Sequence, residues 1–447
     1  MRTHFQIEPI RRLWRLALPL IIANISTPIL GLADAAISGH LDHAYYLAAV
    51  TVGAELLVAF FGAFSFLRMG TTGMVAQAVG ASDHSLSFSI LSHAISLATI
   101  IGIGLFVLGS QIITPVLELA QVPAEMHRPL EEYLETRLWG GLANLVLLVL
   151  TGWFICRGNT PIALYLAISI NLLNICLNYT LAIGCQMNSF GIALGTAISE
   201  YVGLIIAFTI LALELRNKGQ LIDRSWHLPL VIKLIKVNLP LMIRTIGLHS
   251  VFVTLSIFAA RLGTIEAASI GLILVLLATA AYALDGFAHA AEIEAGQSLG
   301  ERHFNRFIDS LKGGAILSGV SAVTIISIFT IFQLQIFSAL TDFIAVIEHA
   351  SSLMVWFAGF VLVLCWSYWL DGVFIGLTKT VDMCRTMCFS VGFGWFGGLW
   401  AFGSTSLDSL MGAFLTFSIP RTLFLALRLP GVIQEVRLRS DQNHLRS

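Results

Sequence analysis

The sequence has few charged residues. Asp, Glu, Lys and Arg make up 11% of its 447 residues, whereas 57% are hydrophobic and the mean hydropathy is +0.86. A water-soluble domain carries roughly 25% charged residues, so the charge here is less than half of what a water-exposed surface needs. Most of the outer surface is therefore predicted to face lipid. The formal net charge of −1 argues against nucleic acid as a partner.

The sequence also lacks the motifs of several function classes. Its six cysteines are scattered without CxxC or metal-ligand spacing, which predicts small core residues and no metal site. It has no phosphate-binding GxxxxGK[ST] loop, which argues against ATP as the energy source. It has no HExxH, GxSxG or paired Cys/His site, so an enzyme finds no support. We therefore expect no catalytic residues.

Twelve long apolar runs account for most of the chain. A membrane-spanning helix needs about 20 apolar residues, and each run reaches that length. The sequence therefore predicts an all-α polytopic membrane protein with twelve transmembrane helices. The predicted spans are 13–39, 46–70, 86–116, 133–155, 160–184, 190–213, 230–260, 267–297, 309–334, 345–375, 383–403 and 407–428.

Lysine and arginine gather on one side of these spans. They are concentrated at residues 2–15, 216–236 and 428–446. Because positively charged loops stay in the cytoplasm, both termini are predicted to be cytoplasmic. The opposite loops are predicted to hold only Arg128, Arg137 and Arg261.

The two halves of the chain resemble each other. LALPLII around Pro19 returns as VNLPLMI around Pro240, and AQAVG around Gln77 returns as GQSLG around Gln297. These steps of 221 and 220 residues indicate an internal repeat. Each half has six spans, so the halves run in the same direction and are related by a pseudo-two-fold axis along the membrane normal, an arrangement that transporters use for alternating access. The predicted parts are an N-lobe at 1–215, a cytoplasmic linker at 216–229, a C-lobe at 230–428 and a cytoplasmic tail at 429–447.

Asp34 is a carboxylate inside the first predicted span. A charged residue within the membrane costs about 2.5–3.5 kcal/mol on insertion scales, so it needs an explanation. At 1.5 Å per residue, Asp34 lies roughly 10 Å outside the midplane. Pro28 cannot donate to the carbonyl of Asn24, so the helix can bend there. We predict Asp34 as a proton-binding residue and Pro28 as a helix hinge; the alternative is a permanently protonated or hydrogen-bonded structural Asp34.

Three asparagines share one face of the fifth predicted span. Asn171, Asn174 and Asn178 follow one another at spacings of three and four. Asn178 reaches about the same depth as Asp34, and Glu55 in the second span also lies in the outer half. We predict that these four residues neighbour a cation or substrate site around Asp34. Alternatively, the asparagines only hold helices together.

The C-terminal half has its own polar residues. Asp285, His289 and Glu292 share one face of the eighth span, and histidines in series with carboxylates can relay protons. A packed polar patch, or a salt bridge to Arg244, is equally consistent with this spacing. Asp371, near the inner end of the tenth span, is predicted as a gate or helix-end residue.

Two further acidic residues lie within predicted spans. Glu294 lies nearer the cytoplasm and is predicted to be solvated. Glu200 lies near the midplane of the sixth span, and the sequence assigns it no role.

Together these segments resemble the multidrug and toxic compound extrusion (MATE) transporters, and within them the DNA-damage-inducible DinF branch. The resemblance covers essentially the whole chain and implies two six-helix lobes around a V-shaped central cleft. It implies antiport, in which cations enter as cationic or amphipathic drugs leave. The protonatable Asp of helix 1 falls on Asp34, and the helix 5 face falls on Asn174 and Asn178. The segments that carry it are LALPLIIANISTPILGLADAAISGHL (16–41), FLRMGTTGMVAQAVG (66–80), NLLNICLNYTLAIG (171–184), YALDGFAHAAEIEAGQ (282–297) and WLDGVFIG (369–376).

The chain departs from this family pattern at one position. Relatives commonly carry a second Asp in helix 5, where this chain has Asn178. A hard cation such as Na⁺ needs several oxygen ligands, including charged ones, so the departure favours H⁺. The sodium-coupled branch has an acidic residue in helix 7, and residues 240–252 contain none.

We therefore expect an H⁺-coupled secondary active multidrug efflux antiporter of the bacterial inner (plasma) membrane. H⁺ is its coupling ion, and no cofactor is expected. Its partners are small amphipathic or cationic drugs and the lipid bilayer, and it acts as a monomer. The alternatives are a Na⁺-coupled antiporter, a lipid-precursor flippase of the same superfamily, and an ion channel, which the doubled lobes disfavour.

Overall fold

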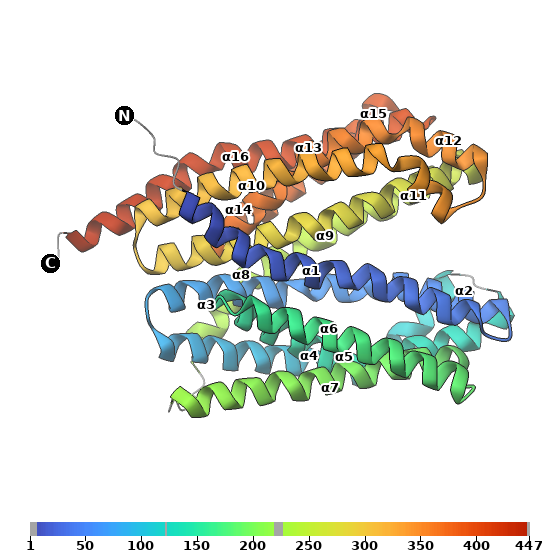
Figure 1. The fold of residues 1–447 in the computed structure, drawn as a ribbon, viewed down its shortest axis with the longest axis horizontal. Coiled ribbons are helices and arrows are strands. Elements are labelled where there is room, and N and C mark those ends of the chain that lie inside the picture. The colour runs from blue at the N-terminus through green and yellow to red at the C-terminus, as the bar shows by residue number, and fades with distance from the viewer. Residues whose placement is uncertain (1–6, 121–122, 219–226, 445–447) are drawn as a thin grey trace. The chain divides into compact units, whose positions relative to one another are not determined.

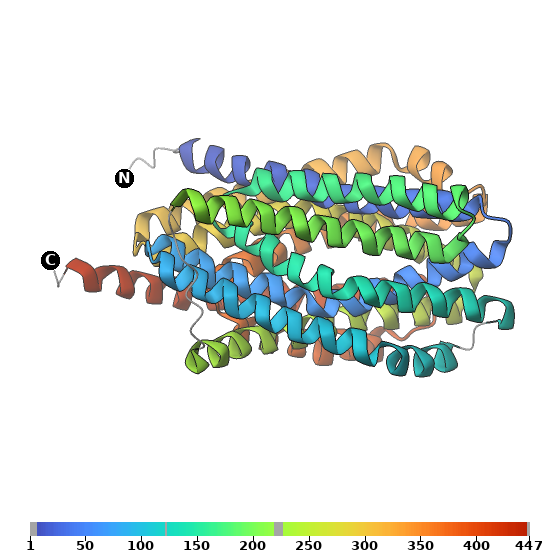
Figure 2. The same cartoon turned by 90° about the horizontal axis from the view of Figure 1, so that it is seen from below.

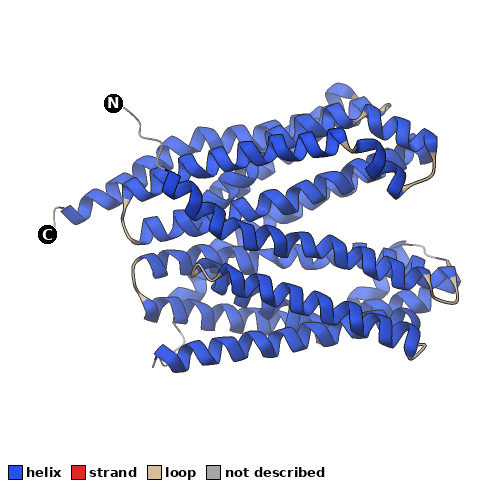
Figure 3. Ribbon diagram, viewed as in Figure 1, coloured by secondary structure: helices blue, strands red, loops and turns tan. Residues whose placement is uncertain are grey.

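The computed structural model describes residues 7–120, 123–218 and 227–444. Within these residues the secondary structure is helical, without a strand (Figure 3). A helix satisfies the backbone polar groups within its own segment, as a lipid environment requires. Eleven of the described helical segments are long and apolar enough to cross a membrane.

The predicted span at 383–403 is a helix with a π-helical stretch in its middle. It consists of α14 (Thr380–Phe389), the π-helix η3 (Ser390–Phe396) and α15 (Gly397–Phe402). Four glycines lie between residues 392 and 398, and glycine is unfavourable inside helices. The twelve predicted spans thus correspond to the eleven long apolar segments and to this helix, which is not one of the eleven.

The described chain forms two compact units, and each is described by itself. The N-terminal unit comprises Ile25–Val75 and Asp83–Ile235, and the C-terminal unit comprises Met1–Asn24, Ala76–Ser82 and Lys236–Ser447. Each unit has its own hydrophobic core.

The N-terminal unit is arranged around one central helix. Its elements are the second part of α1 (Ile7–Gly39), α2 (Ala44–Gly62), η1 (Ala63–Ser65), most of α3 (Phe66–Gly80), α4 (His84–Ala120), α5 (Ala124–Cys156), α6 (Thr160–Tyr179), the π-helix η2 (Thr180–Gly184), α7 (Asn188–Lys218) and the start of α8 (Leu228–Leu262). Helix α5 packs against α2, α4, α6 and α7 (Figures 1 and 2). It contributes Leu130, Tyr133 and Leu134 to the buried core.

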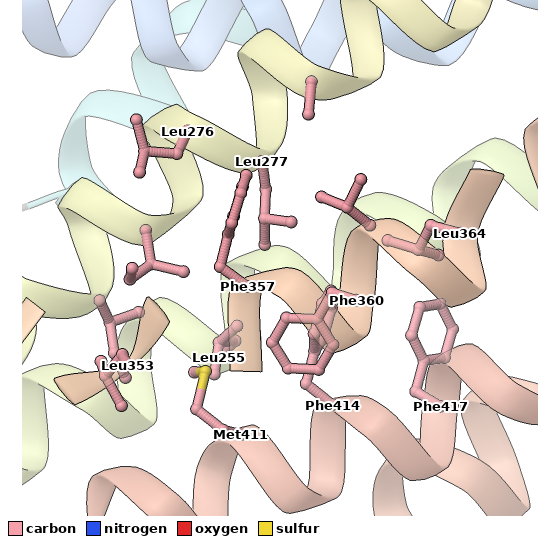
Figure 4. Packing of buried hydrophobic residues seen from close by; sticks show 14 of the residues in the cluster. Leu255, Leu276, Leu277, Leu353, Phe357, Phe360, Leu364, Met411, Phe414 and Phe417 are labelled. Atoms are coloured by element: carbon pink, nitrogen blue, oxygen red, sulfur yellow. The ribbon is translucent and has the colours of Figure 1, made fainter. Parts of the chain in front are cut away.

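The C-terminal unit is arranged around two helices, α9 (Thr264–Gly300) and α13 (Met354–Gly376), which pack against each other. In its core, Phe357 and Phe360 of α13 lie among side chains of α9 and of the last helix, α16 (Figure 4). The rings of Phe360 and Phe414 meet edge to face with centroids 4.8 Å apart. The unit's other elements are the remaining parts of α1, α3 and α8, together with α10 (Phe304–Ile331), α11 (Gln333–Leu340), α12 (Ile344–Ser352), α14, η3, α15 and α16 (Leu407–His444).

The predicted lobe boundaries concern segments that the structure describes only in part. Helix α7 ends at Lys218 and α8 begins at Leu228, so most of the predicted linker at 216–229 lies outside the described residues. The predicted tail begins at residue 429, within α16, which continues to His444. The division into lobes at 1–215 and 230–428 stays a prediction.

Candidate functional site

Asp34 lies near the end of α1, in the N-terminal unit, and its side chain is half-buried. Its Oδ1 accepts a hydrogen bond from Nδ2 of Asn178 at 2.7 Å. The same nitrogen donates to Oδ1 of Asn174 at 2.6 Å. One turn before Asn174 on α6, Nδ2 of Asn171 donates to Oγ of Ser26 at 2.7 Å. The structure therefore brings the asparagine face of α6 against α1.

Helix α7 also borders the site, where it packs against Asn178. Oγ1 of Thr196 lies 3.5 Å from Nδ2 of Asn178. The preceding residue, Gly195, permits this approach, because a Cβ there would lie 2.9 Å from the backbone nitrogen of Asn178. Asn178 is fully buried, and its Oδ1 accepts no hydrogen bond from the described residues. A buried polar atom without a partner is costly. Oδ1 of Asn178 is therefore an acceptor that can take a further hydrogen bond beside Asp34.

Two other predicted residues lie outside this network. Glu55 is exposed on α2, and the hydrogen bonds described around Asp34 do not include it. Pro28 lies inside α1, which is helical throughout. The helix passes from the C-terminal to the N-terminal unit between Asn24 and Ile25. Because Pro28 has no N–H for the carbonyl of Asn24, the helix changes units in a turn that lacks one backbone hydrogen bond.

A buried ion pair lies between α5 and α7 of the N-terminal unit. Nη1 of Arg137 donates to Oε2 of Glu200 at 3.1 Å, and Nδ2 of Asn144 donates to Oε1 at 3.1 Å. Both carboxylate oxygens of Glu200 on α7 thus accept from α5. This ion pair therefore joins α5 to α7 within the N-terminal unit.

Arg137 is not the outer-loop residue that its position in the sequence suggested. Helix α5 begins at Ala124, so Arg137 lies inside the helix, and its side chain is only 12% exposed. Glu200, which the sequence left without a role, is its partner. A buried carboxylate is costly unless it is paired, so Glu200 within a span indicated a buried partner, but the sequence did not say which residue it is.

Asp371 forms a second buried ion cluster, in the C-terminal unit. Its Oδ2 accepts hydrogen bonds from Nη2 of Arg421 on α16, at 2.6 Å, and from Nη2 of Arg244 on α8. The guanidinium of Arg421 also lies over the ring of Tyr368, with Cζ 5.5 Å from the ring centroid. Two arginines from two helices thus hold Asp371, which lies inside α13. Its predicted role as a gate stays a prediction, and Arg421 was not singled out from the sequence.

The predicted relay face of α9 is buried to different degrees along its length. Nδ1 of His289 lies 3.3 Å from Oε2 of Glu292, which is fully buried, whereas Asp285 is half-buried. The guanidinium of Arg244, considered above as a partner of this face, donates to Asp371. A relay through these residues stays a prediction.

Glu294 is buried, so the prediction that it is solvated is wrong. Its carboxylate is 3% exposed and forms ion pairs with Arg12 of α1, at 2.7 Å, and with Arg306 of α10, at 3.1 Å. These arginines belong to helices far apart in the sequence, so the spacing along α9 alone could not predict them.

A model of the protein family described as MatE matches residues 19–180 and 240–400, which together make up more than half of the chain. The chain belongs to the MATE family. Members of this family are membrane transporters and not enzymes, and the chain is accordingly a multi-pass membrane protein. The two matched regions of the MATE model begin at Pro19 and Pro240, the prolines that open the two similar segments of the sequence.

Relatives of known name extend this MATE assignment over most of the chain. The DNA damage-inducible protein F of Escherichia coli is 34% identical over 384 residues, which cover 84% of this chain and 83% of that protein. A probable multidrug resistance protein NorM of Acinetobacter baylyi is 24% identical and covers 84% of this chain and 85% of its own. The multidrug resistance protein PmpM of Pseudomonas aeruginosa is 28% identical and covers 58% of this chain and 54% of its own.

Solved MATE structures share the fold. An outward-facing multidrug resistance MATE family transporter of the MOP superfamily superposes with a TM-score of 0.86 at 17% identity, covering 97% of this chain and 96% of that one. A MOP superfamily transporter from Pyrococcus furiosus gives a TM-score of 0.85 at 17% identity, with the same coverage. The predicted all-α polytopic membrane fold is thereby confirmed.

Proposed function

We propose that this MATE chain is an H⁺-coupled antiporter that exports small cationic or amphipathic drug-like molecules by alternating access. It works as a monomer in the bacterial inner membrane, with both termini in the cytoplasm. The relatives named for multidrug resistance support the substrate class. The hydrogen bond between Asp34 and Asn178 carries the proposal of the coupling ion.

The chemistry around Asp34 suits a proton better than a metal cation. The residues that hydrogen-bond to Asp34 and extend its network are the neutral amides Asn178 and Asn174. A hard cation such as Na⁺ prefers several oxygen ligands, including charged ones. A proton needs one titrating carboxyl group and one acceptor, and both are present at Asp34 and at Oδ1 of Asn178.

Protonation of Asp34 reverses the direction of its hydrogen bonding. In the structure Asp34 accepts from Nδ2 of Asn178, whereas a protonated carboxyl group has an O–H to donate. Rotation of the Asn178 amide then presents its Oδ1 as the acceptor. We propose that this exchange alters the contact between α6 and α1, that α1 bends at Pro28, and that the drug leaves.

The test is transport in proteoliposomes with an imposed H⁺ or Na⁺ gradient. Asp34→Asn is expected to abolish export driven by the H⁺ gradient, because the amide cannot exchange a proton, while the protein still folds. Glu55→Gln, which removes an exposed carboxylate, serves as the matched control and is expected to retain export. Normal export by Asp34→Asn, or export by the wild type that follows only the Na⁺ gradient, contradicts the proposal.

The flippase alternative requires a cationic cavity for a phosphate headgroup. Arg244, which lies within a span, donates to Asp371, so its guanidinium group is engaged within the protein. This contact favours the drug antiporter.

A further inference from the structure

A groove lies between α14 and α16 of the C-terminal unit. Its volume is about 430 Å³, and the residues that line it belong to this unit. The two helices also pack against each other (Figure 1). Six side chains of the lining divide into a charged group and a large apolar group: Asp382, Arg385 and Arg428 in the first, and Phe389, Phe424 and Leu427 in the second. The groove therefore offers one ligand both a charged and an apolar surface.

The charged and apolar parts of the groove lie at different positions along the helices. Near the start of α14, Oδ1 of Asp382 lies 3.9 Å from Nε of Arg428 on α16. About two turns further along α14, the ring of Phe389 meets the ring of Phe424 edge to face, with centroids 4.7 Å apart. The residue numbers run in opposite directions on the two helices, so the helices are antiparallel here. The groove is thus charged toward the start of α14 and apolar further into the span.

The charged part lies where a headgroup region is expected. Arg428 is roughly 30 Å along α16 from its first residue, Leu407, at 1.5 Å per residue. That distance is about the thickness of the hydrocarbon core of a bilayer. Helix α14 begins at Thr380, so Arg385 lies in its second turn. The order of charged and apolar side chains along the groove therefore matches the order of headgroup and acyl chain in a lipid.

The charges of the groove favour an anion. Arg385 is exposed. The side chain of Arg428 is 63% exposed, and its 3.9 Å approach to Asp382 is longer than a hydrogen bond. Lys379, which precedes α14, pairs with Glu435 of α16 and adds no net charge. Two arginines and one carboxylate give the groove a formal charge of +1, which attracts a phosphate group and repels a cationic drug.

The apolar end of the groove continues onto an exposed apolar face. The rings of Phe389 and Phe393 stack with centroids 4.7 Å apart. Phe393 and Leu427 are 73% and 65% exposed. Exposed apolar side chains that adjoin one another mark an interaction surface, and in a predicted membrane span that surface meets acyl chains. A soluble anion would leave this surface uncovered, whereas a lipid with an anionic headgroup covers both ends of the groove.

We propose that this groove binds one anionic phospholipid, with its phosphate between Arg385 and Arg428 and an acyl chain along Phe389 and Phe424. Basic pockets between transmembrane helices bind lipid headgroups of this kind. The proposed orientation of the chain makes this a lipid of the cytoplasmic leaflet. Because the groove occupies only one end of the span, it holds the lipid without moving it across the membrane.

The test measures lipid binding to the purified protein in detergent by native mass spectrometry. Phosphatidylglycerol and phosphatidylcholine with the same acyl chains are titrated, so that the headgroup is the difference between them. The wild type is expected to bind the first phosphatidylglycerol more tightly than the first phosphatidylcholine. Arg385→Gln and Arg428→Gln are each expected to weaken phosphatidylglycerol binding about fivefold. Asp382→Asn removes a carboxylate that competes with the phosphate for Arg428 and is expected to strengthen it.

The matched control is Arg439→Gln, on the same helix. Arg439 is exposed on α16, and it does not line the groove. Its substitution removes the same charge as Arg428→Gln and is expected to leave the affinity for phosphatidylglycerol unchanged. Equal weakening by Arg439→Gln and Arg428→Gln would show a general attraction of anionic lipid to this end of α16 and overturn the groove as the site.

A soluble competitor separates a lipid from a free phosphate. Glycerol phosphate carries the phosphate without the acyl chains and is expected not to displace phosphatidylglycerol at equal concentration. Displacement would make the groove a site for soluble anions and overturn the proposal, as would equal affinity of the wild type for the two lipids. Binding by the solubilised protein requires neither transport nor an H⁺ gradient, so this result and the result for proton coupling at Asp34 stand or fall separately.

Discussion

Two aspartates of this chain, Asp34 and Asp371, differ in the groups that hold them. Asp34 is half-buried and accepts a hydrogen bond from the neutral amide of Asn178. Asp371 is buried and accepts from two guanidinium groups, those of Arg244 and Arg421. Because two buried arginines depend on Asp371 for their anion, we expect it to contribute to the stability of the C-terminal unit.

Substitution of Asp371 by Asn is expected to destabilise the protein. It leaves Arg244 and Arg421 buried without their anion, and breaking a buried ion pair in this way costs about 3–5 kcal/mol. The midpoint of thermal unfolding in detergent, followed by tryptophan fluorescence, should fall by several degrees. The control is Asp382→Asn, which removes a partly exposed carboxylate 3.9 Å from the exposed Arg428. An unchanged midpoint for Asp371→Asn would show that the two arginines do not depend on it.

At the scale of the element, residue spacing predicted which polar side chains share one face of a helix. It did not predict which residues of other helices contact that face. The spacing of Asn171, Asn174 and Asn178 gave the polar face of α6, and the structure brings this face to α1. The partners of Glu200 and Glu294 come from other helices, α5 in one case and α1 and α10 in the other. No periodicity within a single helix contains that information. Helix packing supplies it, and so the ion pairs appeared only in the structure.

Helix α1 is the element whose bending the proposed mechanism requires. Its two parts belong to different compact units, and the boundary between the units falls between Asn24 and Ile25. The missing N–H of Pro28 leaves the carbonyl of Asn24 without its helical donor. Helices kink at such positions. Pro28, the proposed hinge, therefore lies within about one turn of the change of unit.

Replacement of Pro28 by Ala is expected to slow export several-fold while the drug still binds. The alanine N–H can donate to the carbonyl of Asn24, which straightens and stiffens the turn. Turnover in proteoliposomes and drug affinity in detergent measure the two effects separately. Pro115→Ala, at a proline inside α4, is the matched control and should alter neither. If Pro28→Ala turns over at the wild-type rate, α1 does not act as a hinge.

At the scale of the whole molecule, the internal repeat was the most informative sequence signal. The similar segments at Pro19 and Pro240 coincide with the starts of the two family matches. The same equivalence appears within each unit, because α5 and α13, the fourth predicted span of each half, pack centrally in their own units. Hydropathy predicted the spans because every helix that crosses the lipid needs about 20 mostly apolar residues. It did not predict the π-helix η3 in the eleventh, since a change of helix type leaves no signal in an apolar run.

The orientation of the chain in the membrane decides from which side the proton reaches Asp34. Helix α16 runs from Leu407 to His444, so position 441 lies about 50 Å along it from Leu407, two residues after position 405, at 1.5 Å per residue. This exceeds the roughly 30 Å of the hydrocarbon core, so labels at these positions report opposite sides. In a cysteine-free background, a membrane-impermeant maleimide should label Thr405→Cys in intact spheroplasts and Asp441→Cys only after lysis. The reverse pattern would place Asp34 in the cytoplasmic half of the membrane, and proton loading from outside would then be untenable.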